Sequence, residues 1–246
     1  MSMTHEVIFE TDGRHSSVYL YEPPMDARKY VEPIDEVLDL GIDTISYVVG
    51  DCSVLLYDTK VGERWGDNID LIDHTVWYRA ALNAGAMFEQ GMDPMQIVCD
   101  HAHKRGFQFL PHLLLNMLHS SHERVTNGRV ADFTTAHPEW QVGEEPDYPE
   151  SLHDIPSRLS YAVPEVRANR LAVIRELVNR YPTDGIEVNF YTYAPFIARS
   201  EVNEHTQTIT EWVRQIRTVC DEASATQGRS KRLAVRVGAT IEKNKA

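Results

Sequence analysis

Hydrophobic and polar positions along the chain follow two periods, and each period is typical of one kind of element. Short apolar or β-branched runs predict strands, whereas apolar residues spaced three or four positions apart predict helices. The predicted strands are Glu6–Glu10, Ile42–Val49, Phe107–Leu115, Asp184–Tyr191 and Arg232–Val237. The predicted helices are Asp26–Leu40, His74–Gln90, Pro94–Lys104, Pro164–Tyr181 and Glu204–Ala223. Strands and helices therefore alternate along the whole chain.

This alternation predicts a parallel sheet with helical crossovers, because no tight hairpin signal joins consecutive strands. An open doubly wound sheet and a closed barrel both fit. The first strand is not followed by a dinucleotide or phosphate-loop glycine motif, so we expect no cofactor. Polar residues instead collect at the carboxyl ends of strands, which is typical of barrels. We therefore expect an α/β fold with a closed parallel barrel.

Composition and charge narrow the classes of partner. The formal net charge is −13, which argues against nucleic acid and anionic membrane as partners, since both need a basic face. No apolar run reaches the ~18 residues of a membrane span. The first residues, MSMTHEVIFE, lack the basic and apolar regions of a signal peptide. Localisation therefore stays open, with the cytoplasm as the default.

The cysteine and histidine spacings do not predict a metal site. Three cysteines stand far apart, and no C-x-x-C pair occurs. His101 and His103 lie on a predicted helix, where their rings would be about 200° apart. His112 and His119 could approach one another, but their spacing matches no known ligand set. We therefore expect no metal.

The predicted strand Asp184–Tyr191 carries the most informative polar residues. Its side chains alternate, with Ile186, Val188 and Phe190 on one face and Glu187, Asn189 and Tyr191 on the other. In a barrel the apolar face packs on the helices and the polar face points inward. Polar groups inside a barrel must be hydrogen-bonded or used. This face is therefore either a functional site or a polar network that only fixes the interior.

Glycoside cleavage needs two carboxylates on opposite sides of the scissile bond, and Glu187 could be one of them. No second carboxylate is placed equally well. Asp12 and Asp51, which follow the first two strands, are the best available, and each is equally well explained as a turn or cap residue. Arg236 points inward from the fifth strand. It either pairs with Glu187 or holds a carboxylate or sulfate of a substrate.

Several segments together resemble glycosidase-like barrel proteins. The matching segments are Gly91–Gly106 (GMDPMQIVCDHAHKRG), His137–Trp140 (HPEW), Tyr161–Arg167 (YAVPEVR), Asp184–Phe190 (DGIEVNF) and Leu233–Val237 (LAVRV). The fourth segment is similar to the family's DGIELDF strand. Each segment alone is weak, but their order and spacing from about residue 5 to the end are fairly specific for the family. They are not specific for a substrate.

The resemblance implies a (β/α)8 barrel that hydrolyses a polysaccharide or an oligosaccharide. This chain would then be an incomplete α/β barrel of about five βα units, one partial catalytic-type domain over residues 1–246. Glu187 matches the family's strand-four glutamate, and Arg236 matches its strand-five arginine. Asn116 and His119 match the Asn and His of an R-M-N-D-x-H segment after strand three. We therefore predict Glu187 as catalytic. The predicted substrate-binding residues are Asn116, His119, Asn189, Tyr191, Arg236 and Asp12.

The chain also departs from the family pattern. Asn189 stands where DGIELDF has aspartate, and Leu114 and Met117 replace the Arg and Asp of R-M-N-D-x-H. These changes indicate a less ionic pocket or a degenerate one. Two alternatives therefore stay open: a non-catalytic carbohydrate-binding barrel remnant, and a barrel lyase or isomerase that uses His119 and Tyr191 as acid and base.

The sequence ends at Ala246, just after the fifth predicted strand, whereas family members continue through three more βα units. Five parallel strands would leave two exposed sheet edges, which invite association with another chain. We therefore expect either a piece of a longer barrel or a homo-oligomer formed through these edges.

Overall fold

A computed structural model describes residues 6–51, 54–67, 74–117, 130–145 and 155–239. Five main strands form one parallel sheet in chain order. They are β1 (Ile8–Thr11), β2 (Thr44–Asp51), β5 (Gln108–Leu114), β6 (Gly185–Asn189) and β7 (Arg232–Arg236). Two short strands, β3 (Val54–Leu55) and β4 (Glu63–Arg64), extend the sheet beside the end of β2, with β3 antiparallel to it.

Within the described residues, five helices connect these strands. They are α1 (Ala27–Asp35), α2 (Thr75–Glu89), α3 (Pro94–Lys104), α6 (Pro164–Arg180) and α7 (Val202–Gln227). The described residues also form shorter helical segments: a π-helical turn η1 (Arg14–Val18), α5 (Asp132–Thr135), and the 3-10 turns η2 (Pro138–Trp140), η4 (Ile155–Ser157) and η5 (Arg199–Glu201). Asp93 caps α3 by accepting a hydrogen bond from the Met95 N–H, and Pro94 occupies its first position. Among the described residues, no helix is long and apolar enough to cross a membrane.

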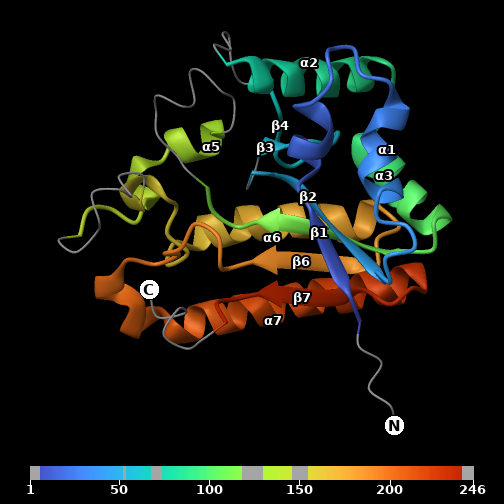
Figure 1. Cartoon of the computed structure of the whole chain (residues 1–246). Helices are drawn as coiled ribbons and strands as arrows, with labels where there is room; N and C mark the ends of the chain where they lie inside the picture. The colour runs from blue at the N-terminus through green and yellow to red at the C-terminus, as the bar shows by residue number, and fades with distance from the viewer. Residues whose placement is uncertain (1–5, 52–53, 68–73, 118–129, 146–154, 240–246) are drawn as a thin grey trace.

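The hydrophobic core lies between one face of the sheet and the helices. Alternate residues of β2 and β6, among them Ile45, Tyr47, Ile186 and Val188, are buried in this layer. Helices α6 and α7 lie behind β5, β6 and β7, and α1 and α3 lie together beside β2 (Figure 1). The other face of the sheet carries the polar residues, as expected for the inner face of a barrel wall.

The two edge strands of the parallel sheet, β1 and β7, are linked by side chains across the inner face. Glu10 of β1 pairs with Arg236 of β7, and Glu6, just before β1, pairs with Arg232. Arg232 also donates to Thr44 Oγ1 at 3.0 Å. In Figure 1, β1 passes in front of β6 and β7. The sheet is therefore curled, and its first and last strands face each other.

The five predicted strands and the main helices are confirmed, with shorter ends in several places. The first helix ends at Asp35 rather than Leu40, and Pro33 lies inside it. The fourth main strand ends at Asn189, two residues before Tyr191. Strands β3 and β4 were not predicted, because two-residue strands show no period.

Candidate active site

Each main strand contributes one polar residue to a cluster on the inner face. The cluster consists of Glu10, Ser46, His112, Glu187 and Arg236, from β1, β2, β5, β6 and β7 in turn. Strand pairing aligns them, because Glu10 is in register with Ser46, and His112 with Glu187. These positions alternate with the residues that pack on the helices, so all five side chains point to the same side.

Glu187 lies at the centre of this cluster and is nearly buried, with 5% of its surface exposed. Arg236 Nε donates to its Oε1 at 2.7 Å, and Ser46 Oγ donates to its Oε2 at 2.5 Å. Burial raises the pKa of the carboxyl group, but the hydrogen bonds from Arg236 and Ser46 help to outweigh it. The pKa of Glu187 therefore lies below its usual range, and the carboxylate is ionised at neutral pH.

Arg236 joins two carboxylates, Glu10 on the edge strand β1 and Glu187 on β6, the strand next to its own. Its Nε bonds Glu187, and its Nη1 bonds Glu10 Oε2. Burial lowers the pKa of the guanidinium group, but its hydrogen bonds to the two carboxylates and their negative charges raise the pKa by more. The pKa therefore lies above its usual value, and Arg236 stays charged. The predicted pairing of Arg236 with Glu187 is thus present. Whether Arg236 also contacts a substrate stays a prediction.

His112 lies next to both carboxylates and is fully buried. Its Nδ1 is 3.4 Å from Ser46 Oγ, 3.6 Å from Glu10 Oε1 and 3.9 Å from Glu187 Oε1. Its Nε2 is 3.0 Å from the amide nitrogen of Asn189. Burial lowers the pKa of His112 below its ordinary value, although the carboxylates act in the opposite direction.

The other predicted site residues lie in different surroundings. Asn116 is buried, and its amide group exchanges two hydrogen bonds with the backbone of Leu159, at 3.1 and 3.3 Å. Asp12 accepts hydrogen bonds from the backbone and the guanidinium group of Arg14. Tyr191 follows the end of β6, and 51% of its surface is exposed. His119 lies outside the described residues. Substrate contacts by these four residues stay predictions.

Sequence reasoning did not single out Glu10, Ser46 or His112 as members of the site. The signal was present, because Ser46 and His112 are polar residues inside apolar strands. Glu10 ends the first predicted strand. The alternation rule applied to Glu187 would have identified Ser46 and His112. It could not show that β1 and β7 come together and bring Glu10 to Arg236.

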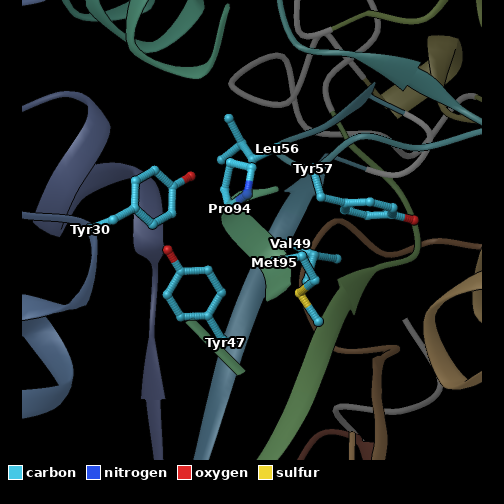
Figure 2. Close-up of a pocket in the computed structure, with 7 residues that line it drawn as sticks. All are labelled: Tyr30, Tyr47, Val49, Leu56, Tyr57, Pro94 and Met95. Atoms are coloured by element: carbon cyan, nitrogen blue, oxygen red, sulfur yellow. The ribbon is translucent and has the colours of Figure 1, made fainter. Parts of the chain in front are cut away.

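Two hollows lie apart from the cluster. A cavity of about 10 Å³ lies between the sheet and helices α1 and α3, lined by Tyr30, Tyr47, Val49, Leu56, Tyr57, Pro94 and Met95. Figure 2 shows the Tyr30 and Tyr47 hydroxyls pointing toward one another there. A wider hollow of about 330 Å³ is lined by Thr59, Gly62, Glu63, Arg64, Asp67 and Asp132. None of the predicted site residues that the structure describes lines either hollow.

The cluster is suited to reactions that use an ionised carboxylate held by a cation. An ionised Glu187 can act as a nucleophile or a base, whereas a proton donor needs a raised pKa. Among the described residues, no group of three or more His, Cys, Asp or Glu side chains is arranged to hold a metal ion.

Comparison with known proteins gives the family. Residues 14–233 match the family model described as glycosyl hydrolase-like 10. The chain belongs to this family. The predicted resemblance to glycosidase-like barrel proteins is thereby confirmed.

Curated relatives in the same comparison are named glycosyl hydrolase DigH. The proteins from Escherichia coli K12 and Shigella flexneri are each 26% identical to the chain over 189 residues. The matched region is 73% of this glycosyl hydrolase-like 10 chain but only 39% of each relative. The chain thus spans well under half the length of the curated relatives that it matches.

Solved structures show the same fold. The maltogenic alpha-amylase AmyB from Thermotoga neapolitana superposes with a TM-score of 0.52 and 13% identity, over 96% of this chain and 46% of that one. Alpha-L-fucosidase isoenzyme 2 from Paenibacillus thiaminolyticus gives 0.50 and 12%, over 96% and 33%. At such identities the likeness concerns the fold alone. The predicted fold class is confirmed: an α/β chain consistent with an incomplete (β/α)8 barrel.

Proposed function

We propose that this glycosyl hydrolase-like 10 chain belongs to a glycoside hydrolase acting on O-glycosidic bonds of a polysaccharide or an oligosaccharide. Residues 1–246 would form one partial barrel domain of it. The observation that carries the proposal is Glu187, a buried carboxylate held ionised by Arg236 and Ser46 on the inner face. The family and the fold support the same class of reaction.

Glu187 would be the nucleophile, or the base that activates water. Glu10 is the second carboxylate that the sequence left unidentified. It shares Arg236 with Glu187, and 35% of its side chain is exposed, so it is reachable from solvent. Two carboxylates beside one sugar-binding position are the minimum that glycoside hydrolysis requires. Asn189, Tyr191, Arg236, Asp12, Asn116 and His119 stay predictions for substrate contacts.

Glu187→Gln tests the catalytic role of this carboxylate, because the amide keeps the shape and loses the charge. We expect the rate of oligosaccharide hydrolysis to fall by at least about 100-fold, the effect of losing a nucleophile or base. The rate is measured on a panel of oligosaccharides by release of reducing ends.

Glu176→Gln is a matched control, because the side chains of Glu176 and Glu187 are each 6% exposed and paired with an arginine. Glu176 accepts hydrogen bonds from Tyr57 and Thr59 on the helix side of the sheet. Its variant should lose stability but keep its rate per folded molecule. Equal rates in the two variants would remove Glu187 from the mechanism.

A non-catalytic carbohydrate-binding role is the second candidate. It is favoured by the bonding of Glu187, whose two oxygens are both engaged by side chains of the cluster. Calorimetric titration of the unmodified protein with the same oligosaccharides separates the two functions. Binding without turnover would select the second.

A further inference from the structure

The orientation of the Asn189 carboxamide is determined by the backbone that follows β6. The backbone N–H groups of Tyr191 and Thr192 point at Asn189 Oδ1, at 2.8 and 2.9 Å. A backbone N–H can only donate, so the atom facing both must be the amide oxygen. The NH₂ group therefore faces the other way, toward His112 Nε2 at 3.0 Å and Thr192 Oγ1 at 3.0 Å.

This NH₂ group determines which nitrogen of His112 carries the proton. Because the NH₂ group donates, Nε2 of His112 must accept, and a neutral ring then carries its proton on Nδ1. The ring is fully buried, and burial favours its neutral form. The charged groups that face it are Glu10 from β1, Glu187 from β6 and Arg236 from β7, with Asp12 acting from beyond β1.

The proton on Nδ1 faces the carboxylates. The nearest acceptor is Ser46 Oγ at 3.4 Å, and Glu10 and Glu187 lie slightly farther away. Ser46 gives its own proton to Glu187 Oε2, so its oxygen can accept the proton of His112. Each donor in this series therefore points toward Glu187.

We propose that Asn189 is a positioning residue that holds the proton of His112 on Nδ1 and so directs a chain of hydrogen bonds, through His112 and Ser46, onto Glu187. Aligned donors strengthen one another and stabilise an ionised acceptor. Aspartate, which the family pattern has at this position, offers no proton to His112. The reactive role of Glu187 rests on the proposed function, but the direction of these hydrogen bonds does not.

Asn189→Asp tests this inference with almost no change in size. The new carboxylate can only accept, so a proton is expected on Nε2 of His112. In a neutral ring Nδ1 then has no proton and accepts the hydrogen bond of Ser46. Ser46 therefore no longer donates to Glu187. We expect the pKa of Glu187 to rise by about one unit. The measurements are the ¹⁵N NMR shifts of the ring nitrogens and the pH titration of the Glu187 carboxyl carbon by ¹³C NMR.

Asn179→Asp is the control, because it adds the same charge on the exposed surface of α6. In the wild type and in this control, His112 should show a pyrrole-type Nδ1 and a pyridine-type Nε2 at pH 7. In Asn189→Asp, Nε2 should become pyrrole-type. A proton on Nε2 in the wild type overturns the proposal, even if the variant does not fold, and so does an unchanged ring in a folded variant.

The activity assay separates this inference from the proposed function. If the protein hydrolyses oligosaccharides, Asn189→Asp should move the acid limb of kcat/KM to higher pH by the shift measured for Glu187. If no hydrolysis occurs while the ring nitrogens behave as expected, only the proposed function fails.

Discussion

At the scale of single residues, hydrogen-bond donors determine which groups of the cluster carry a proton. Arg236 and Ser46 donate to Glu187, and Asn189 donates to His112. The result is one ionised carboxylate and one neutral imidazole, side by side in a buried setting. Because the neutral ring is buried, protonation of His112 should change the free energy of unfolding of the protein.

The stability of the protein should fall as the pH falls below about 6.5, the ordinary pKa of histidine. The folded-state pKa of His112 is lower, so the unfolded chain takes up a proton first and is favoured. The loss is about 1.4 kcal/mol for each unit between the two values. Urea unfolding at pH 7.5 and pH 5.5 measures it, and His112→Gln should reduce the difference.

The comparison needs a control at a second histidine. His137→Gln changes a ring whose side chain is 36% exposed and which pairs with Glu139 at the surface. This variant should keep the wild-type difference between the two pH values. A loss of the difference in both variants, or in neither, would contradict the account given for His112.

At the scale of elements, the sequence predicts strands and helices with a periodic pattern and misses strands too short to show one. The parallel strands and their helices were identified because each has a period long enough to recognise. Strands β3 and β4 were missed because neither exceeds two residues. The inward residues of Asp184–Tyr191 were predicted from alternation, but Tyr191 fell outside because the strand ends at Asn189. Side-chain alternation holds only while the chain stays extended.

One glycine determines how closely β6 and β7 pair. Gly185 begins β6 at φ 144°, and a Cβ there would overlap the backbone of Arg232. We expect Gly185→Ala to destabilise the protein by about 3 kcal/mol or more, because both backbone strain and overlap must be relieved. Thermal and urea unfolding measure the loss.

Gly106→Ala is the matched control. Gly106 also has a positive φ, 90°, but nothing lies within 4 Å of the position of its Cβ. Only the backbone strain then applies, about 1 kcal/mol. Equal losses of stability at the two positions would show that the close approach of β6 and β7 does not add to the effect of Gly185→Ala.

At the scale of the whole molecule, β1 and β7 are the outer strands of the parallel sheet. Among the described residues, side chains connect these two strands but strand pairing does not. Apolar residues are exposed at both edges, with Ile8 at 44% and Val235 at 40%. Unpaired strands of this kind form contacts with other strands. The predicted homo-oligomer remains a proposal, and these edges are where it would form.

We expect self-association that increases with protein concentration and with salt, since salt screens the repulsion from a net charge of −13. Val235→Lys places a charge on an edge strand and should weaken the association. Val61→Lys, at a position 42% exposed between β3 and β4, should not. Sedimentation velocity over a concentration series measures both, and a wild type that is monomeric throughout would exclude this interface.

The ion pairs between the edges also determine when the cluster can form during synthesis. Glu6 and Arg232 are 226 residues apart in the chain, and Glu10 and Arg236 are separated by the same interval. Ribosomes produce the N-terminal strands first, and contacts this distant in sequence close late. Glu10 and Glu187 therefore have no arginine partner until the chain as far as Arg236 has left the ribosome. The carboxylates at the proposed reactive position thus reach their native environment only after all five main strands have been made.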